Sequence, residues 1–303
     1  MVTNTGGMER GGRDLLDSAL VYERSGLWDK VQAQLEAAKK EAAERHDEAL
    51  ELEVDLGFAR LAGRRGRKSD AVMEATRVYE RAVAKRQVDM AAQAKNILGA
   101  IAELTGDWQE ATAHFKDALA LEGVSPRTRG KVLQNLGAVA AQQKDFAQAR
   151  EWFRQSVEAW KSVGYGVGLA LAVTNLAAAT LDSDDPQQGA ALALEGVQLA
   201  REENALDVLG IALENRADAL FRLGRRADAL DTLAEALGLF SNAQDHLRMA
   251  QCLELFGAMY QNTEPATAAN AWAKGLRIAE QAQASWLADR FRTRLATLPR
   301  ADA

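Results

Sequence analysis

The feature that most constrains this chain is a segment that recurs about every 40 residues. Its clearest copy is Val132–Ala141, with the sequence VLQNLGAVAA. A small residue marks the same point in each copy: Ala19, Gly57, Gly99, Gly137, Ala177, Ala217 and Gly257. A period of about 20–50 residues is typical of arrays in which each repeat buries its hydrophobic face against its neighbours. The period therefore predicts the architecture before any single element is assigned.

Two further small residues follow in each copy, and their spacing predicts a pair of packed helices. After Gly99 come Ala111 and Ala118, with Phe115 between them. Small side chains let two helix backbones approach, and large apolar ones fill the neighbouring holes. With aromatic residues at 6% and Ala, Leu, Glu, Gln and Arg dominant, the composition favours helices over strands.

Proline and glycine mark where these helices begin and end. The pairs Ser125-Pro126, Asp185-Pro186 and Glu264-Pro265 place proline just inside a helix start, where its missing N–H costs nothing. We expect left-handed residues after helix ends at Gly26, Gly106 and Gly224.

The landmarks Leu98-Gly99, Ala111, Phe115 and Ala118 resemble those of the tetratricopeptide repeat (TPR). The resemblance covers roughly residues 14–298. Its longer period resembles the arrays of kinesin light chains, of Rap-type peptide-sensing regulators and of the sensor halves of some large transcription activators. The added residues predict either about one more helical turn or a longer link between helices.

This resemblance implies an all-α fold, a right-handed TPR-like α-solenoid of about seven antiparallel helix pairs. We expect one solenoid domain at 14–298, ending in a capping helix at 285–298, with tails at 1–13 and 299–303. Two repeats depart from the pattern. Repeat two, about 45–87, is predicted to have an enlarged basic turn, and repeat seven is one residue short.

Charge and cysteine content exclude several classes of function. The net charge of −6 argues against nonspecific nucleic-acid binding, which needs a basic surface. The single cysteine, Cys252, lies in an apolar helical run, so we predict a core residue, no disulfide within the chain and a reducing compartment. No window has the ~18 uninterrupted apolar residues of a membrane span, and we expect a cytoplasmic protein.

A column of amides is the most suggestive chemical feature. Asn135, Asn175 and Asn215 stand two residues before the small residue of their repeats, Asn96 is displaced by one, and acidic residues occupy this place in the first two repeats, namely Asp17 and Asp55. In the resembled family this part of the first helix lines a concave groove. An amide both donates and accepts hydrogen bonds, so the four asparagines can pair with an extended peptide backbone. The alternative is that they bridge neighbouring helices or face solvent.

Other polar residues one turn away on these helices are predicted to flank the amides: Lys131, Gln142, Glu214, Asp218, Arg222, Gln251 and Glu254. Their mixed charges select no ligand of one sign. We predict partner-binding sites at Asn96, Asn135, Asn175, Asn215, Lys131, Gln142, Asp218 and Arg222.

Catalysis has little support in the sequence. His46, His114 and His246 lack the partners of a metal site or a catalytic triad, so we expect neither an enzyme nor a cofactor. The densest basic segment, Arg60–Ser69, lacks the spacing of a phosphate loop. It is interpreted as a solvated turn between helices, and the alternative is a contact for an anion or an acidic partner.

The sequence therefore favours a non-enzymatic TPR adaptor that holds a segment of a partner protein or peptide in its groove, without nucleic acid or membrane. One alternative is a ligand-responsive regulator whose superhelix changes pitch on binding. The other is a self-assembling scaffold, although nothing in the sequence indicates a homo-oligomer.

Overall fold

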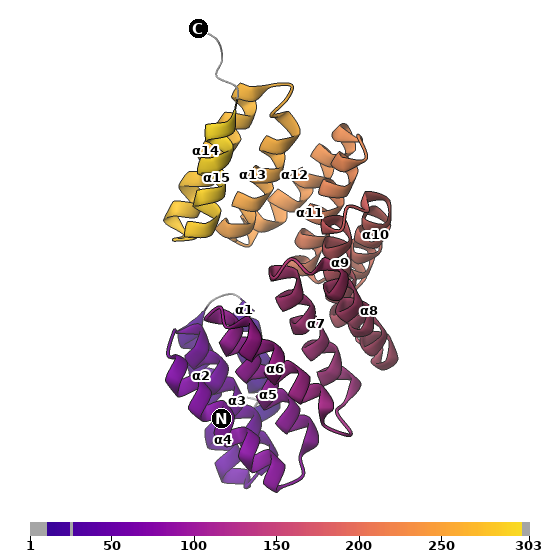
Figure 1. The fold of residues 1–303 in the computed structure, drawn as a ribbon. Coiled ribbons are helices and arrows are strands. Elements are labelled where there is room, and N and C mark those ends of the chain that lie inside the picture. The colour runs from indigo at the N-terminus through magenta and orange to yellow at the C-terminus, as the bar shows by residue number, and fades with distance from the viewer. Residues whose placement is uncertain (1–10, 25–26, 299–303) are drawn as a thin grey trace, which may run out of the picture. The chain divides into compact units, whose positions relative to one another are not determined.

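The computed structural model describes residues 11–24 and 27–298, and within them the chain forms fifteen α-helices and no strands (Figure 1). The helices are α1 Gly12–Arg24, α2 Trp28–Arg45, α3 Glu48–Arg64, α4 Lys68–Ala84, α5 Val88–Leu104, α6 Trp108–Ala120, α7 Pro126–Gln142, α8 Phe146–Val163, α9 Gly166–Asp182, α10 Pro186–Glu202, α11 Leu206–Arg222, α12 Arg226–Asn242, α13 His246–Tyr260, α14 Pro265–Gln281 and α15 Ser285–Thr297. The predicted cap at Gly26, residues 1–10 of the predicted N-terminal tail and the tail at 299–303 lie outside the described residues.

The chain divides into two compact units, and the division falls within α7, between Val139 and Ala140. In unit 1, each helix from α1 to α6 packs on one that adjoins it in sequence, and α3 also contacts α1 and α5. In unit 2, α8 to α15 pack in the same sequential way, and α11 also contacts α9 and α13. Short links make consecutive helices antiparallel. The all-α helical-repeat class predicted from the sequence is confirmed, whereas the single domain at 14–298 stays a prediction.

The long period is carried by long helices rather than long links. From α9 to α12 every helix has 17 residues. The links between them have three residues, at 183–185, 203–205 and 223–225. The middle residue of each link adopts a positive φ, at 61° in Asp184, 51° in Asn204 and 76° in Gly224. This left-handed residue ends one helix and allows the next to start at once.

The predicted helix starts and ends are confirmed where the structure describes them. Pro126, Pro186 and Pro265 are each the first residue of their helix. Gly106 and Gly224 follow helix ends with φ of 77° and 76°. Aspartates cap several further N-termini: Asp47, Asp107, Asp145, Asp185 and Asp245 each accept a backbone hydrogen bond from the third residue on.

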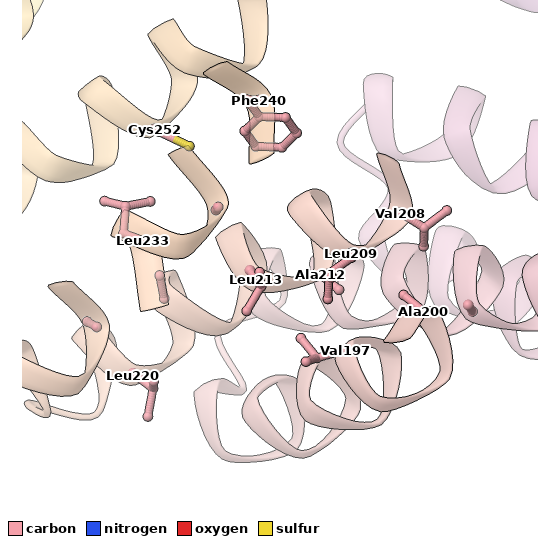
Figure 2. Close-up of a cluster of buried hydrophobic side chains, with 14 of the residues drawn as sticks. Val197, Ala200, Val208, Leu209, Ala212, Leu213, Leu220, Leu233, Phe240 and Cys252 are labelled. Atoms are coloured by element: carbon pink, nitrogen blue, oxygen red, sulfur yellow. The ribbon is translucent and has the colours of Figure 1, made fainter. Parts of the chain in front are cut away.

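Small residues permit the close helix packing expected from the repeat. A Cβ added to Gly99 would lie 2.5 Å from Cε1 of Phe115, on the partner helix of the same repeat. In unit 2 the core passes from one repeat to the next, and Figure 2 shows Val197, Leu213, Leu233 and Cys252 from successive helices in one cluster. Cys252 is 1% exposed, so its prediction as a core residue is confirmed. No helix among the described residues is long and apolar enough to span a bilayer.

The basic segment of repeat two is not an enlarged turn, and that prediction is wrong. Helix α3 continues to Arg64 and α4 starts at Lys68, so only residues 65–67 form the link. Arg, Leu and Ala sustain the helix, and Gly66 supplies the left-handed residue at φ 74°. The segment is also bound within unit 1, since Arg65 donates to Asp29 at 2.7 Å and to Gln32 at 2.6 Å. Repeat seven departs as expected, with α13 shortened to 15 residues.

Candidate partner-binding face

Each unit has a cavity lined only by odd-numbered helices, the first helices of the predicted pairs. The unit 1 cavity has a volume of about 320 Å³ and lies on α1, α3, α5 and α7. The unit 2 cavity has a volume of about 370 Å³ and lies on α9, α11, α13 and α15. These helices also carry every asparagine of the predicted column. The two cavities are therefore the places to examine for a partner site.

Basic side chains predominate in the unit 1 cavity. Its lining residues are Leu20, Glu23, Arg60, Arg64, Gln93, Asn96, Ile97, Thr128 and Lys131. Arg60 is neutralised by Glu23, with 3.3 Å between Nε and Oε2. Arg64 is exposed and has no carboxylate partner within the described part of the chain. The guanidinium of Arg64 therefore leaves this cavity with positive charge available to an anionic group.

A well-satisfied carboxylate fixes one wall of the unit 1 cavity. Asp89 on α5 accepts hydrogen bonds at 2.9 Å from the backbone N–H of Ser125 and from the Thr128 hydroxyl at the start of α7. Burial opposes ionisation of Asp89, but these bonds and one from Gln93 outweigh it and leave its pKa below the ordinary value. Asp89 therefore holds α5 and α7 together as an ionised group.

Carboxylates and arginines are mixed in the unit 2 cavity. Its lining residues are Asp182, Glu214, Asn215, Asp218, Phe221, Arg222, Gln251, Glu254, Leu255, Ala258, Arg290 and Arg294. Arg222 pairs with Asp218 at 2.8 Å and donates to the backbone carbonyl of Leu181 at 2.7 Å. Arg290 and Arg294 of α15 both pair with the buried Glu254 of α13, at 2.8 and 2.7 Å. All three arginines of the lining are thus bound by the chain itself.

Two carboxylates in the unit 2 cavity are left without hydrogen bonds from the described residues. Oε2 of Glu214 is buried and accepts no hydrogen bond, and its nearest cation, Arg248, is 3.7 Å away. Burial raises the pKa of Glu214 to about 7, although Arg248 opposes the shift. Asp182 lies at the exposed rim, on the last residue of α9, and has no ion-pair partner there. The unit 2 cavity therefore favours a cationic or proton-donating group.

The predicted amide column is partly used within the protein. The Nδ2 of Asn135 donates to Oδ1 of Asn96 at 2.9 Å, joining α7 to α5. The Nδ2 of Asn215 donates to the backbone carbonyl of Thr174 at 3.0 Å, joining α11 to α9. Bridging of neighbouring helices, the alternative interpretation, thus applies to these amides. The Asn175 amide has no hydrogen-bond partner among the described residues.

The structure gathers only some of the predicted site residues. Asn96 and Lys131 line the unit 1 cavity, and Asn215, Asp218 and Arg222 line the unit 2 cavity, as do the flanking Glu214, Gln251 and Glu254. Asn135 reaches the unit 1 cavity only through Asn96, and neither Asn175 nor Gln142 lines either cavity. Asp55 faces the even-numbered helices instead. It is 2% exposed and paired with Arg77 and Arg81 at 3.2 and 3.0 Å.

Three charged lining residues of the unit 2 cavity, Asp182, Arg290 and Arg294, are not predicted as site residues from the sequence. Arg60 and Arg64 of the unit 1 cavity belong to the basic segment Arg60–Ser69, whose alternative interpretation is a contact for an anion or an acidic partner. Arg290 and Arg294 lie within the capping helix predicted at 285–298, and a terminal cap is expected to have a polar outer face. One signal in the sequence could have indicated that arginines lie in the unit 2 cavity. Glu214 and Glu254 occupy the same position in consecutive repeats, three residues before the small residue. Two carboxylates stacked in this way require counter-charges nearby. No group of three or more His, Cys, Asp or Glu among the described residues is placed to hold a metal ion.

Comparison with known proteins identifies the repeat and the fold. Residues 130–159 match the family model of the tetratricopeptide repeat. A search of curated proteins finds no match.

Three of the similar solved structures place the repeat in context, and at their low sequence identity they show the fold alone. A Rap protein solved in complex with competence and sporulation factor has a TM-score of 0.67 and 12% identity, with 93% of this chain and 80% of that chain covered. A STAND ATPase with a tetratricopeptide repeat sensor from Pyrococcus horikoshii has a TM-score of 0.69 and 13% identity, covering 93% and 43%. Aspartyl phosphate phosphatase F from Bacillus subtilis has a TM-score of 0.55 and 13% identity, covering 97% and 80%. The matched repeat and this shared fold make the chain a helical-repeat protein of the tetratricopeptide type.

Proposed function

We propose that this chain is a non-enzymatic binding protein that holds a segment of a partner protein on its odd-numbered helices, and that the unit 2 cavity receives a basic group of that segment. The observation that carries the proposal is the buried Oε2 of Glu214, which accepts no hydrogen bond in a cavity whose arginines are already bound. A lysine or arginine side chain would supply the missing donors.

The desolvated position of Glu214 makes such a contact favourable. A buried polar atom without a hydrogen bond costs about 1–3 kcal/mol, and a donor from the partner would recover that cost. The surrounding charges also favour a basic group, since Asp182 and Asp218 lie in the same lining as Glu214. Of these two, Asp218 is already paired with Arg222. Within each unit, the stacked repeats add a surface suited to a chain segment, as arrays of this kind commonly present one. The similar Rap protein, which was solved with a bound factor, supports the same class of function.

Peptides tested against the intact protein would examine this proposal. A library of soluble peptides would be screened, and each binder compared with a copy in which its Lys and Arg are replaced by Gln. We expect the original basic peptide to bind at least fivefold more tightly than its Gln-substituted copy. Glu214→Gln should remove that preference. The matched control is Glu195→Gln, an exposed carboxylate on the even-numbered helix α10. Basic binders that are unaffected by Glu214→Gln would contradict the role of this cavity.

The amide column contributes a separate, finer part of the proposal. Asn175→Ala removes an amide that has no partner within the described chain, so weaker peptide binding with unchanged stability would support direct contact. Asn215→Ala removes the bridge to Thr174 and should lower stability as well. If both variants, and Asn135→Ala, bind every peptide as the parent does, the amides serve the fold alone.

A further inference from the structure

Unit 2 contains a second cavity, larger and mostly apolar, on α12, α13 and α14. It has a volume of about 520 Å³ and lies between α12 and α14, with α13 as its floor. We call it the α12–α14 cavity, and its lining residues are Leu230, Leu233, Ala234, Leu237, Cys252, Leu253, Phe256, Tyr260, Thr267, Asn270, Ala271 and Lys274. Small-molecule sites typically have about 300–1,000 Å³, with apolar walls and a few polar groups.

This cavity is separate from the proposed partner face. Helix α13 contributes to both, but through opposite sides, because successive residues of a helix turn by about 100°. Gln251, Glu254, Leu255 and Ala258 line the unit 2 cavity. Cys252, Leu253, Phe256 and Tyr260 line the α12–α14 cavity. A molecule bound here would leave the partner face open.

Three positions of the walls carry larger apolar side chains than the same positions one repeat earlier. Forty residues before Leu230, Leu233 and Phe256 stand Ala190, Ala193 and Arg216. The large side chains nevertheless do not close the space, since Leu230, Leu237 and Phe256 remain partly exposed at the cavity. Covering apolar surface is worth about 25 cal/mol per Å². These residues therefore favour an apolar occupant.

Apart from Cys252 and Tyr260 of α13, the polar residues of the cavity lining come from α14, and their charge differs from that of the preceding repeat. Thr267, Asn270 and Lys274 take the places held in α12 by Asp228, Asp231 and Glu235, aligned on Ala268 and Ala229. Three carboxylates are thus replaced by two neutral groups and a cation.

The ammonium group of Lys274 is available to a ligand. Lys274 is exposed and is the one charged residue of the described lining, with no ion-pair partner within the described chain. A second cation lies close by, because the guanidinium of Arg226 stacks 4.0 Å from the ring centre of Tyr260. The Thr267 hydroxyl is already used, since it donates to Glu264 at 3.1 Å.

We propose that the α12–α14 cavity binds a small amphipathic carboxylate, with its apolar chain between α12 and α14 and its carboxylate at Lys274. Asn270, exposed one turn before Lys274 on α14, would donate a second hydrogen bond to the same carboxylate. A molecule with a cationic or neutral head of equal chain length would gain the apolar contacts but not the charge pairing.

Calorimetric titration of the intact protein would test this with three probes that share a ten-carbon chain: decanoate and decyltrimethylammonium below their micelle-forming concentrations, and decanol below its solubility limit. We expect one saturable site with decanoate bound at least fivefold more tightly than either of the others. Lys274→Glu should reverse the preference between decanoate and decyltrimethylammonium. Equal binding of the three probes, or an unchanged order in Lys274→Glu, would overturn the proposal.

A variant that fills the cavity adds an independent test. Ala271→Trp places a large ring in the space, whereas Ala273→Trp puts the same ring on the exposed side of α14 as the matched control. We expect only Ala271→Trp to lose decanoate binding, with helix content retained in both by circular dichroism.

Discussion

The two units each have a cavity on their odd-numbered helices, but these cavities leave opposite charges available. In unit 1 the single carboxylate of the lining, Glu23, pairs with Arg60. The guanidinium of Arg64 is therefore left without a carboxylate partner among the described residues. In unit 2 the carboxylates exceed the arginines, and Glu214 is left unsatisfied. A repeating backbone thus supplies two similar hollows, and a few side chains decide which group of a partner each hollow favours.

The buried carboxylates of the two units explain part of this difference. Asp55 of unit 1 faces the even-numbered helices and forms ion pairs with Arg77 and Arg81 of α4, away from the cavity. Glu254 of unit 2 lies in the cavity lining and takes Arg290 and Arg294 from α15. Because Glu254 uses both arginines, they provide little free positive charge for Glu214. The charge of each cavity therefore depends on which way its buried carboxylate faces.

Removing the buried carboxylate of unit 2 should have the largest effect. Glu254→Ala leaves Arg290 and Arg294 without their partner and releases the capping helix α15 from α13. Breaking a buried pair of this kind costs about 3 kcal/mol. We expect the amides of α15 to exchange hydrogen roughly a hundredfold faster, with unit 1 unchanged.

Glu280→Ala is the matched control for Glu254→Ala. It removes the exposed partner of Arg292, another arginine of α15, and exposed pairs contribute at most about 1 kcal/mol. If both variants loosen α15 equally, the buried position of Glu254 has no special role. A separate measurement is the binding of basic peptides by Glu254→Ala. The arginines freed in this variant should compete with the peptide for Glu214 and so weaken binding.

The unsatisfied Glu214 should make unit 2 less stable as the pH rises. Its pKa is raised from 4.5 to about 7, so between these values the unfolded chain has lost a proton that the folded chain retains. Stability therefore falls from about pH 4.5 to about pH 7 and then levels off. Glu214→Gln removes this loss, and we expect it to stabilise unit 2 by about 2 kcal/mol at pH 8 and by little at pH 4.

Chemical denaturation of Glu214→Gln across this pH range, followed by exchange of the α11 and α13 amides, would measure the effect. Glu195→Gln, on the exposed side of α10, should show no pH-dependent difference from the parent. A Glu214→Gln protein with the same stability gain at pH 4 and pH 8 would contradict ionisation of Glu214 as the cause.

The sequence predicts the repeat more fully than the cavities because the two depend on different side chains. Packing needs small residues at fixed positions within one repeat, as Gly99 against Phe115 shows, and such a pair can be recognised from the sequence of that repeat alone. The turns are only partly visible in the sequence. Arg86, Asp184 and Gln244 adopt the same left-handed conformation as Gly106, but they are not glycine and give no local signal. Their spacing in multiples of about 20 residues from Gly106 and Gly224 is the signal that could locate them.

The available charge of each cavity could not be predicted from the sequence. Arg222 is predicted from the sequence as a partner-binding residue, yet it donates to the carbonyl of Leu181, 41 residues earlier. Such a contact depends on how far a long side chain reaches across neighbouring helices, which the periodic pattern does not encode. The amides show the same limit, since Asn215 donates to the backbone of Thr174.

The satisfied carboxylate of unit 1, Asp89, should respond to pH in the opposite sense to Glu214, with a smaller effect. Its pKa is lowered, so it stabilises the fold above the ordinary aspartate pKa, and this contribution is lost as the pH falls through the folded value. Asp89→Asn keeps one acceptor and loses the charge that strengthens the bonds from Ser125 and Thr128. We expect a cost of about 1 kcal/mol at pH 7.

Exchange of the α5 and α7 amides at pH 7 and pH 3 would measure the cost of Asp89→Asn. Asp70→Asn, an exposed carboxylate on α4 that pairs with Arg67 at 3.6 Å, is the control and should cost less. The cost of Asp89→Asn should shrink at pH 3, where the parent carboxyl is itself becoming protonated. If the cost is the same at both pH values, the hydrogen bonds hold α7 to α5 without the charge. The difference between Asp89 in unit 1 and Glu214 in unit 2 would then lie in the number of hydrogen bonds that each accepts and not in its charge.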